Sequence, residues 1–288
     1  MNVRAIPIGE FTSQQVAEAL TRSFEGYFLP FSFTAEAYER RFRGEHVDAF
    51  ASRLYFLDDE LKGIILISRR GWTSRVAAMG IVSEARGRGF GTQIMQTAVR
   101  DAENRGDTTI GLEVIEQNTA ATALYTRVGF RPVRRLVGYT WKGSETYTEN
   151  SDTISEIDPS VVARMVATEG DDNLPWLLRA ETLAAQTRPT RGFCIEERVY
   201  VLVTDGPNES VKLLSLIVPR RFRRQGWGTR MIRGIRAQFR GLTITISPVV
   251  PEELVPGFFE KLRFQRFDLT QLEMCVNFSA KADSPGSG

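Results

Sequence analysis

The hydrophobic residues of the chain predict one order of elements that occurs twice. In the first half, residues 75–82 (RVAAMGIV) form an apolar run of strand length, and a turn with three glycines follows at 85–92. Gly106 predicts that a helix after this turn ends in a left-handed residue. Residues 108–115 then alternate apolar and polar positions, as a strand does. Between the turn and Gly106, apolar residues recur at helical spacing: Ile94, Met95, Ala98, Val99 and Ala102. The predicted order is strand, glycine turn, helix, strand.

The second half repeats this order with low overall identity. Residues 211–218 and 242–246 predict the strands, and the apolar face of the helix between them consists of Met231, Ile232, Ile235 and Phe239, with Gly241 after it. The turns correspond at an offset of 137 (228 − 91 = 137), which matches Arg86, Gly89 and Gly91 to Arg223, Gly226 and Gly228. The strands that follow correspond at an offset of 134 (246 − 112 = 134). The chain is therefore predicted to be an internal duplication.

A duplication in a chain of 288 residues favours two domains of ordinary size. The segment between the copies is polar and rich in Ser, Thr and acidic residues, as linkers are. We therefore predict an N-terminal domain over 1–145, a linker over 146–158 and a C-terminal domain over 159–280. The last residues, 281–288, are predicted to be disordered.

Composition excludes several classes of function. Lys and Arg number 37 and Asp and Glu 35, so the formal net charge of +2 gives no general attraction to nucleic acid or to an anionic membrane. The basic run RRFRR at 220–224 is a local exception, but it lies inside the repeated turn. Because His46 is the only histidine and Cys194 and Cys275 are the only cysteines, multi-histidine and four-cysteine metal sites are excluded and no metal is expected.

The start of the chain and its apolar runs indicate where in the cell the protein is expected. MNVRAIPIGEF lacks the apolar core of a signal peptide. The longest apolar runs, such as GIILI at 63–67, are far too short to span a bilayer. We therefore expect a cytoplasmic protein.

The glycine turn carries the first chemical signal. A glycine-rich turn that opens a helix leaves backbone N–H groups unpaired at the positive end of the helix dipole, which suits a phosphate. The dinucleotide-binding pattern G-x-G-x-x-G fails because Thr92 stands at the third glycine, and the Gly-Lys-Ser/Thr of a Walker loop is absent. What remains is R-x-x-G-x-G at Arg86, Gly89 and Gly91, for which an ordinary turn is the alternative interpretation.

A second segment, NTAATALYTRVGF at 118–130, follows the turn, with the strand residues LEV between them. Together the two segments resemble the motifs Q/R-x-x-G-x-G/A and N-x-x-A-x-x-L-Y-x-x-x-G-F of the GNAT superfamily of acetyl-coenzyme A-dependent N-acetyltransferases, over about residues 75–140. The resemblance implies an α/β (α+β) fold with two GNAT-like domains in tandem. Each would have a mixed, mostly antiparallel central sheet with flanking helices. The resemblance also implies acetyl-CoA as the cosubstrate.

The resemblance assigns cofactor-binding residues position by position. In the family, the strand before the turn splays from its neighbour and pairs with the pantetheine arm, and main-chain N–H groups of the turn bind the pyrophosphate. The matching positions are Gly80, Ile81 and Val82 on the strand, Arg86, Gly87, Arg88, Gly89, Phe90, Gly91 and Thr92 in the turn, and Asn118, Ala121 and Tyr125 in the later motif. Asn118 is also expected to cap the motif helix.

Acetyl transfer to an amine needs a base and an acid, because a lysine amine with a pKa of ~10.4 must lose a proton and the departing thiolate must gain one. The resemblance implies Tyr125 as the acid; the alternative is an aromatic residue of the core. Glu113 is the candidate base. It precedes Tyr125 by twelve residues, the spacing found in bacterial enzymes that acetylate ribosomal-protein N-termini. The alternative is a solvated strand glutamate.

The acceptor side of the site is predicted from the first helices. In the family these helices and their loop form the acceptor wall, and RSFEGYFLPF at 22–31 places Phe24 and Tyr27 there. Phe24, Tyr27 and Tyr55 are therefore candidate acceptor-binding residues. A plain hydrophobic core is the alternative.

The second half lacks the catalytic residues. At the offset of 134, Ser247 stands where Glu113 does and Phe259 where Tyr125 does. Prolines at 251 and 256 would also disturb the second motif helix. We expect this half to act as a scaffold that does not catalyse.

The sequence thus predicts an N-acetyltransferase that transfers acetyl from acetyl-CoA to a primary amine by direct attack, working from its first half. No charge pattern identifies the amine, which is a small molecule or a peptide, and the oligomeric state stays open. The alternative is a non-catalytic acyl-CoA-binding or interaction module. Steady thiol release in the presence of amines distinguishes the two.

Overall fold

The computed structural model describes residues 3–28, 32–143 and 152–278, with the side chain of residue 41 excepted. The predicted tail at 281–288 and the first part of the predicted linker, 146–151, lie outside these residues. Within the described ranges, no helix is long and apolar enough to cross a membrane. The chain forms two compact units: unit 1 comprises Met1–Val114, Asn118–Val133 and Glu273–Gly288, and unit 2 comprises Ile115–Gln117 and Arg134–Leu272.

Unit 1 is built on a sheet in which β1 to β4 pair antiparallel and β4 pairs parallel with β5. The strand order is β1-β2-β3-β4-β5-β13. The bounds are β1 (Val3–Pro7), β2 (Arg53–Leu57), β3 (Glu60–Arg70), β4 (Thr73–Ile81), β5 (Thr109–Ile115) and β13 (Gln271–Asn277).

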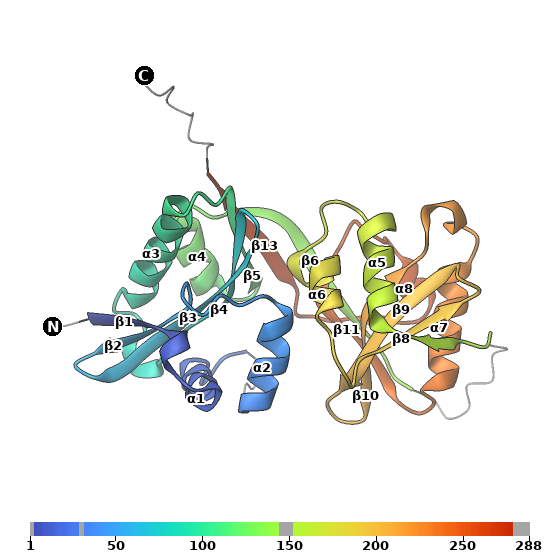
Figure 1. Cartoon of the computed structure of the whole chain (residues 1–288), viewed down its shortest axis with the longest axis horizontal. Helices are drawn as coiled ribbons and strands as arrows, with labels where there is room; N and C mark the ends of the chain where they lie inside the picture. The colour runs from blue at the N-terminus through green and yellow to red at the C-terminus, as the bar shows by residue number, and fades with distance from the viewer. Residues whose placement is uncertain (1–2, 29–31, 144–151, 279–288) are drawn as a thin grey trace, which may run out of the picture. The chain divides into compact units, whose positions relative to one another are not determined.

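Helices cover both faces of this sheet (Figure 1). On one face, Leu20 of α1 (Ser13–Ser23) and Phe42 of α2 (Ala35–Gly44) pack with Ile64 of β3. The other face carries α3 (Phe90–Asn104), where Ile94 approaches Gly63, together with α4 (Thr119–Arg127). Short 3-10 turns precede α1 and α3, at η1 (Ile8–Glu10) and η2 (Ser83–Ala85).

Unit 2 has the strand order β6-β11-β10-β9-β8-β7, and β12 pairs with β6. The strands are β6 (Arg131–Trp141), β7 (Ser155–Ile157), β8 (Arg191–Ile195), β9 (Val199–Gly206), β10 (Ser210–Ile217), β11 (Thr243–Pro251) and β12 (Gln265–Arg266). The helices are α5 (Pro159–Glu169), η3 (Trp176–Leu178), α6 (Ala180–Ala184), η4 (Arg220–Phe222), α7 (Trp227–Gln238) and α8 (Phe258–Lys261). The predicted linker therefore ends in a strand, β7.

The two faces of the unit 2 sheet are covered by different helices. Leu202 of β9 packs with Val162 of α5, whereas its neighbour Val201 packs with Met231 of α7. Alternate side chains of a strand point to opposite faces, so α5 and α7 lie on opposite sides of the sheet. The predicted mixed, mostly antiparallel sheets with flanking helices are confirmed.

The predicted duplication is visible in the strands and helices. Parallel pairing joins β4 to β5 in unit 1 and β10 to β11 in unit 2. Each first strand carries one extra residue opposite its antiparallel partner, at Ala77 in β4 and at Leu214 in β10, which is the offset of 137 again. Gly106 follows the end of α3 and Gly241 follows the end of α7, both in the left-handed conformation (φ 81° and 78°), as was predicted for Gly106.

Two strands, β6 and β13, belong to a different unit from the half of the sequence in which they lie. β6 follows α4 along the chain, but from Arg134 onward it belongs to unit 2 and pairs with β11. β13, the last strand, lies beside β5 in unit 1 (Figure 1), where the Phe278 amide donates to the Thr108 carbonyl at 2.9 Å. The compact units thus differ in these two strands from the halves 1–145 and 159–280 predicted from the duplication.

The exchange predicts how truncation acts on unit 1. A chain that ends at residue 150 lacks β13 and leaves the edge of β5 unpaired, so it should melt at least ~10 °C below the full chain or aggregate. A chain that ends at residue 278 keeps β13 and should melt within ~2 °C of the full chain. Calorimetry of the two truncated chains tests this; a chain ending at 150 with an unchanged unfolding transition for unit 1 would show that β13 is dispensable.

Candidate active site

The predicted phosphate loop has an open face. Gly87 and Gly89 both have positive φ, 73° and 85°, and a Cβ built on either meets no atom within 4 Å. Gly89 is the N-cap of α3. The backbone N–H groups from Gly87 to Thr92 donate to no acceptor in the described part of the chain. The loop therefore offers a row of free N–H donors at a helix N-terminus, which suits an anion.

Gly91 has a different reason to be glycine. A Cβ at this position would lie 2.8 Å from Cδ1 of Leu124. Contacts this short do not occur, so Gly91 lets the first turn of α3 pack against α4. Replacing Gly91 is therefore expected to disturb the packing of α3 against α4 as well as to block the approach of a phosphate. Replacing Gly89 disturbs no such packing contact.

Beyond the loop, β4 and β5 part. Their parallel pairing runs from Thr73–Thr109 to Val76–Leu112, and β4 continues to Ile81. On its other edge, β4 remains paired with β3, so Gly80 lies opposite Ile64. Among the described residues, the edge of β4 that faces away from β3 has no strand partner after Val76. This is the splay that the resemblance implies at Gly80 and Ile81; Val82 lies just beyond, where its amide donates to Lys62.

Three predicted residues meet at one end of the splay. Asn118 is the N-cap of α4 and its Oδ1 accepts from the Ala121 amide at 3.1 Å, which confirms the predicted cap. The side chain of Asn118 also forms a hydrogen bond with Tyr27, from the segment after α1. Tyr27 is in turn close enough to Tyr125 to affect its ionisation.

Tyr125 is a buried phenol with 8% of its surface exposed. Its ring packs against Phe130, with centroids 6.1 Å apart. Burial, and to a lesser degree the neighbouring Tyr27, raise the pKa of Tyr125 well above its ordinary value. The phenol therefore holds its proton at neutral pH, as an acid must before it donates.

Glu113 is not the solvated glutamate of the alternative reading. It lies in a buried ion triad in which Arg75 of β4 contacts Glu113 of β5 and Glu45, the C-cap of α2. The Arg75 Nε and Nη2 atoms both approach Oε2 of Glu113, at 2.7 and 2.6 Å, and Nη1 donates to Glu45 at 2.7 Å. Oε1 of Glu113 accepts from none of the residues that the structure describes. All three side chains are no more than 7% exposed.

Sequence reasoning missed Arg75 and Glu45. Burial lowers the pKa of Arg75, but the two carboxylates outweigh burial and hold it above its ordinary value. The available signal was a charged residue at the start of the buried strand RVAAMGIV, since an arginine is almost never fully buried without an acidic partner.

The other predicted acceptor residues lie in different places. Phe24 packs against β4, because a Cβ on Gly80 would lie 2.9 Å from its ring. Tyr55 faces the α3 side of the sheet: its neighbours Leu54 and Phe56 join the α1 core, and the charges nearest its phenol are Arg53 and Asp101. Burial raises the pKa of Tyr55 to about 12. The structure does not bring Tyr55 to Tyr27 and Tyr125.

The arginines of the loop differ in their contacts. Arg86 donates from its guanidinium to main-chain carbonyls of Ile81, Ser23 and Glu25. Arg88 is exposed and has no partner among the described residues. Of the two, Arg88 is the side chain available to a phosphate.

Unit 2 keeps the shape of this site without its phenol. Arg224 and Gly226 have φ of 61° and 83°, close to the values of Gly87 and Gly89. A Cβ on Gly228 would lie 3.1 Å from Phe258, in the way that Gly91 meets Leu124. The motif helix is only four residues long in α8, as the prolines predicted. Phe259, which stands at the position of Tyr125, is buried with 4% of its surface exposed.

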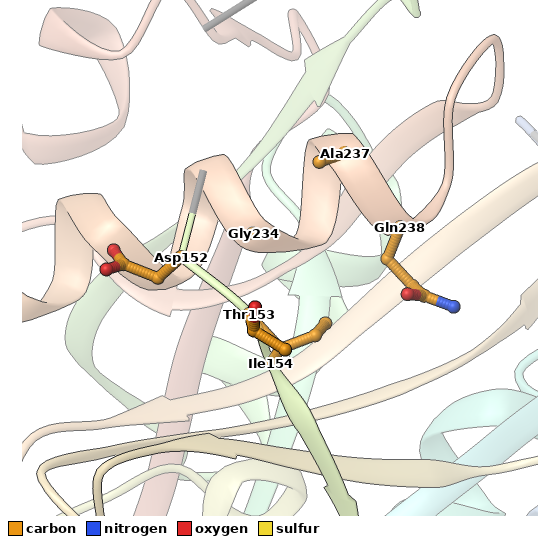
Figure 2. A pocket seen from close by; sticks show the side chains of 6 residues that line it. All are labelled: Asp152, Thr153, Ile154, Gly234, Ala237 and Gln238. Atoms are coloured by element: carbon orange, nitrogen blue, oxygen red, sulfur yellow. The ribbon is translucent and has the colours of Figure 1, made fainter. Parts of the chain in front are cut away.

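Figure 2 shows a hollow in unit 2 whose lining includes no residue of the glycine loop of that unit. It is lined by Asp152, Thr153, Ile154, Gly234, Ala237 and Gln238. The residues before β7 cross α7 at Gly234, where a Cβ would lie within 2.4 Å of Ile154. The hollow thus marks where the end of the linker packs on α7, and no predicted site residue lines it.

Comparisons with known proteins support the resemblance to the GNAT family. A sequence profile of the acetyltransferase (GNAT) family matches residues 14–130. N-alpha-acetyltransferase 30 of Schizosaccharomyces pombe is 38% identical over 80 residues, which are 27% of this chain and 53% of that protein, so the match spans about half of that relative.

Two solved structures share the fold of nearly the whole chain. A putative acetyltransferase from Pyrococcus horikoshii has a TM-score of 0.69 at 18% identity, over 97% of this chain and 90% of that one. A tandem GNAT protein from the clavulanic acid biosynthesis pathway has a TM-score of 0.65 at 15% identity, over 96% of this chain and 98% of that one. These likenesses support the tandem arrangement of the fold.

The ion triad predicts a large effect of Arg75 on stability. Arg75→Met leaves the buried carboxylate of Glu113 without its counter-charge and removes a partner of Glu45, so the free energy of unfolding should fall by ~3–5 kcal/mol. Adding Glu45→Gln and Glu113→Gln removes both charges and should restore much of that loss. The exposed Arg127 offers a control, Arg127→Met, expected to change stability by less than ~0.5 kcal/mol. Chemical denaturation measures all three; a triple variant no more stable than Arg75→Met would contradict the charge argument.

Proposed function

Residues 14–130 belong to the acetyltransferase (GNAT) family, and from this premise we propose that the protein is an acetyl-CoA-dependent N-acetyltransferase that works in unit 1. The observation that carries the proposal is the meeting of three features within one compact unit. These are the loop of free N–H groups, the unpaired edge of β4 and the buried phenol of Tyr125. In unit 2, β10 likewise parts from β11 after Lys212 and Gly226 opens α7 in the left-handed conformation, but Phe259 stands in place of the phenol.

The loop and the strand edge fit the two parts of acetyl-CoA. The free N–H groups from Gly87 to Thr92 would bind the pyrophosphate, because they lie at the positive end of α3. The unpaired edge of β4 at Gly80 and Ile81 would pair with the amides of the pantetheine arm, as another strand would. Acetyl-CoA supplies an acetyl group activated as a thioester. Asn118 and Ala121, at the start of α4, border the same splay.

Tyr125 would supply the proton that the leaving thiolate needs. In the proposed transfer the amine nitrogen bonds to the acetyl carbon, the carbon–sulfur bond breaks, and the sulfur takes the phenolic proton. A thiol has a pKa of ~8.5, below the ~10 of an ordinary tyrosine, so the donation of the proton to the thiolate is uphill and depends on position. The contacts of Tyr125 with Phe130 and of Tyr27 with Asn118 support that position.

Glu113 would take the proton from the attacking amine. Its Oε2 is held by Arg75, whereas Oε1 is free of partners among the described residues. Glu113 also follows Leu112, the last residue of β5 that pairs with β4, so it lies where the splay begins. Proton transfer through one water would suit a buried carboxylate in this place. The competing reading is that Glu113 serves only the ion triad.

The acceptor is a primary amine of a small molecule or peptide. We propose Phe24 and Tyr27 for its wall, since Tyr27 reaches Asn118 and Tyr125. Tyr55, whose phenol lies near Arg53 and Asp101, has no comparable support. Thiol release from acetyl-CoA with a set of amines tests the proposal. Release that depends on an amine supports an enzyme, and binding of acetyl-CoA without release would favour the non-catalytic module.

The open loop yields a matched pair of variants. Gly89 and Gly106 both have positive φ, 85° and 81°, and open space where a Cβ would go. Gly89→Ala and Gly106→Ala should therefore cost similar stability, ~1–2 kcal/mol each. Only Gly89→Ala places a methyl group before the phosphate, so it alone should weaken acetyl-CoA binding by at least ~10-fold. Titration calorimetry compares the two, and equal affinities would remove the loop from the binding site.

Tyr125→Phe keeps the ring and deletes only the hydroxyl group. If the phenol is the acid, kcat should fall by ~10²-fold or more while the affinity for acetyl-CoA changes little. Tyr139→Phe removes a hydroxyl of unit 2 and serves as the control. Steady-state kinetics with saturating amine gives kcat. A Tyr125→Phe variant that retained most of its turnover would leave Tyr125 as a packing residue.

A further inference from the structure

The guanidinium of Arg86 is committed to backbone carbonyls. Its Nε donates to Ile81 at 2.9 Å, at the end of β4. Its Nη2 donates to Glu25 at 2.6 Å and to Ser23 at 3.3 Å. Ser23 and Glu25 lie at the C-terminal end of α1, where helix carbonyls have no intrahelical partner. A cation that caps this end is also favoured by the helix dipole.

These bonds fix the end of α1 on the splayed strand. A Cβ on Gly80 would lie 2.8 Å from Cβ of Ser23, so the helix end already rests on β4 where the strand is unpaired. Arg86 then joins three parts at one point: the end of β4, the glycine loop and the segment that leaves α1. The loop cannot move relative to that segment without breaking these hydrogen bonds.

The segment held by Arg86 leads directly to the acceptor side. Tyr27 follows Glu25 by two residues, packs on Phe24 with ring centroids 5.3 Å apart, and bonds to Asn118. Gly26, between them, has a φ of 70° that few other residues adopt. A short chain of contacts therefore runs from the glycine loop through Arg86 to Tyr27 and Tyr125.

Unit 2 has an equivalent of the hydrogen bonds of Arg86, which we call the clamp, but it lacks an equivalent of the Tyr125 phenol. Nε of Arg223 donates to Val218 at 3.1 Å, and its Nη2 donates to Glu169 at the end of α5. Val218 and Arg223 correspond to Ile81 and Arg86 at the offset of 137. Loss of the clamp in unit 2 should therefore have the same structural cost, in the half that lacks a phenol.

We propose that Arg86 is a positioning residue that holds Tyr27 and the acceptor wall in register with the loop, and that it does not act as the charge that binds pyrophosphate. This rests on the proposed function. The role requires N–H donors that reach carbonyls, whereas a phosphate ligand would require positive charge. Glutamine supplies such donors without charge, and methionine supplies neither. The two roles therefore predict different rankings of variants.

Three variants distinguish these roles. Arg86→Met should lower kcat/KM for the amine by at least about 10-fold, while Kd for acetyl-CoA changes by less than about 3-fold. Arg86→Gln should retain kcat/KM within about 3-fold of the unaltered enzyme, because one amide donor still reaches a carbonyl. Arg223→Met should lower thermal stability as much as Arg86→Met but leave both constants unchanged. If Arg86→Met and Arg86→Gln both weaken acetyl-CoA binding by a similar factor, Arg86 is a phosphate ligand and the proposal is overturned.

A measurement that needs no turnover separates this proposal from the proposed function. Hydrogen exchange of the amides of residues 24–28, in the protein without ligand, should become faster in Arg86→Met and stay near the original rate in Arg86→Gln. If the unaltered enzyme releases no thiol with any amine, the proposed function fails, and the clamp is judged by exchange alone. Equal exchange in all variants would overturn it.

Discussion

The parting of β4 from β5 is the constraint on which the site depends. Parallel pairing stops after Val76 and Leu112, just where the extra residue Ala77 interrupts the regular ladder of β4. A strand edge without a partner leaves main-chain donors and acceptors unsatisfied, which is costly unless water or a ligand takes their place. The positive φ of Gly89 then turns the chain into α3, and the N–H groups of Gly87 to Thr92 donate to no acceptor among the described residues.

The duplication shows which part of this arrangement depends on the backbone alone. Unit 2 keeps the extra strand residue at Leu214 and the left-handed cap at Gly226, and it keeps the backbone turn even where Arg224 replaces glycine. A non-glycine residue in that conformation costs energy, so the surrounding structure must impose the turn. The side chains of the two units differ although this backbone shape is kept. Phe259 fills the core without a hydroxyl.

The limits of the sequence prediction follow from what each pattern reports. Apolar residues at helical spacing and the glycines that end the helices depend on local geometry, so α3 and α7 were predictable, as was the Asn118 cap. Alternation along a strand reports which faces are buried but not which strand lies next to it. The exchange of β6 and β13 joins segments more than a hundred residues apart, and no local pattern encodes it. The domain boundaries placed by duplication alone therefore missed both strands.

The ion triad connects Glu113 to the parting of β4 from β5. Hydrogen bonds hold β4 to β5 as far as Leu112, and the next residue, Glu113, is bonded to Arg75 of β4 through its side chain. The ion pair thus takes over the joining of the two strands at the point where the ladder ends, and Glu45 extends the connection to α2. Buried ion pairs add little net stability, but they fix geometry where a lost partner would be costly. One oxygen of Glu113 accepts from Arg75 at the vertex of the splay, and the other accepts from none of the residues that the structure describes.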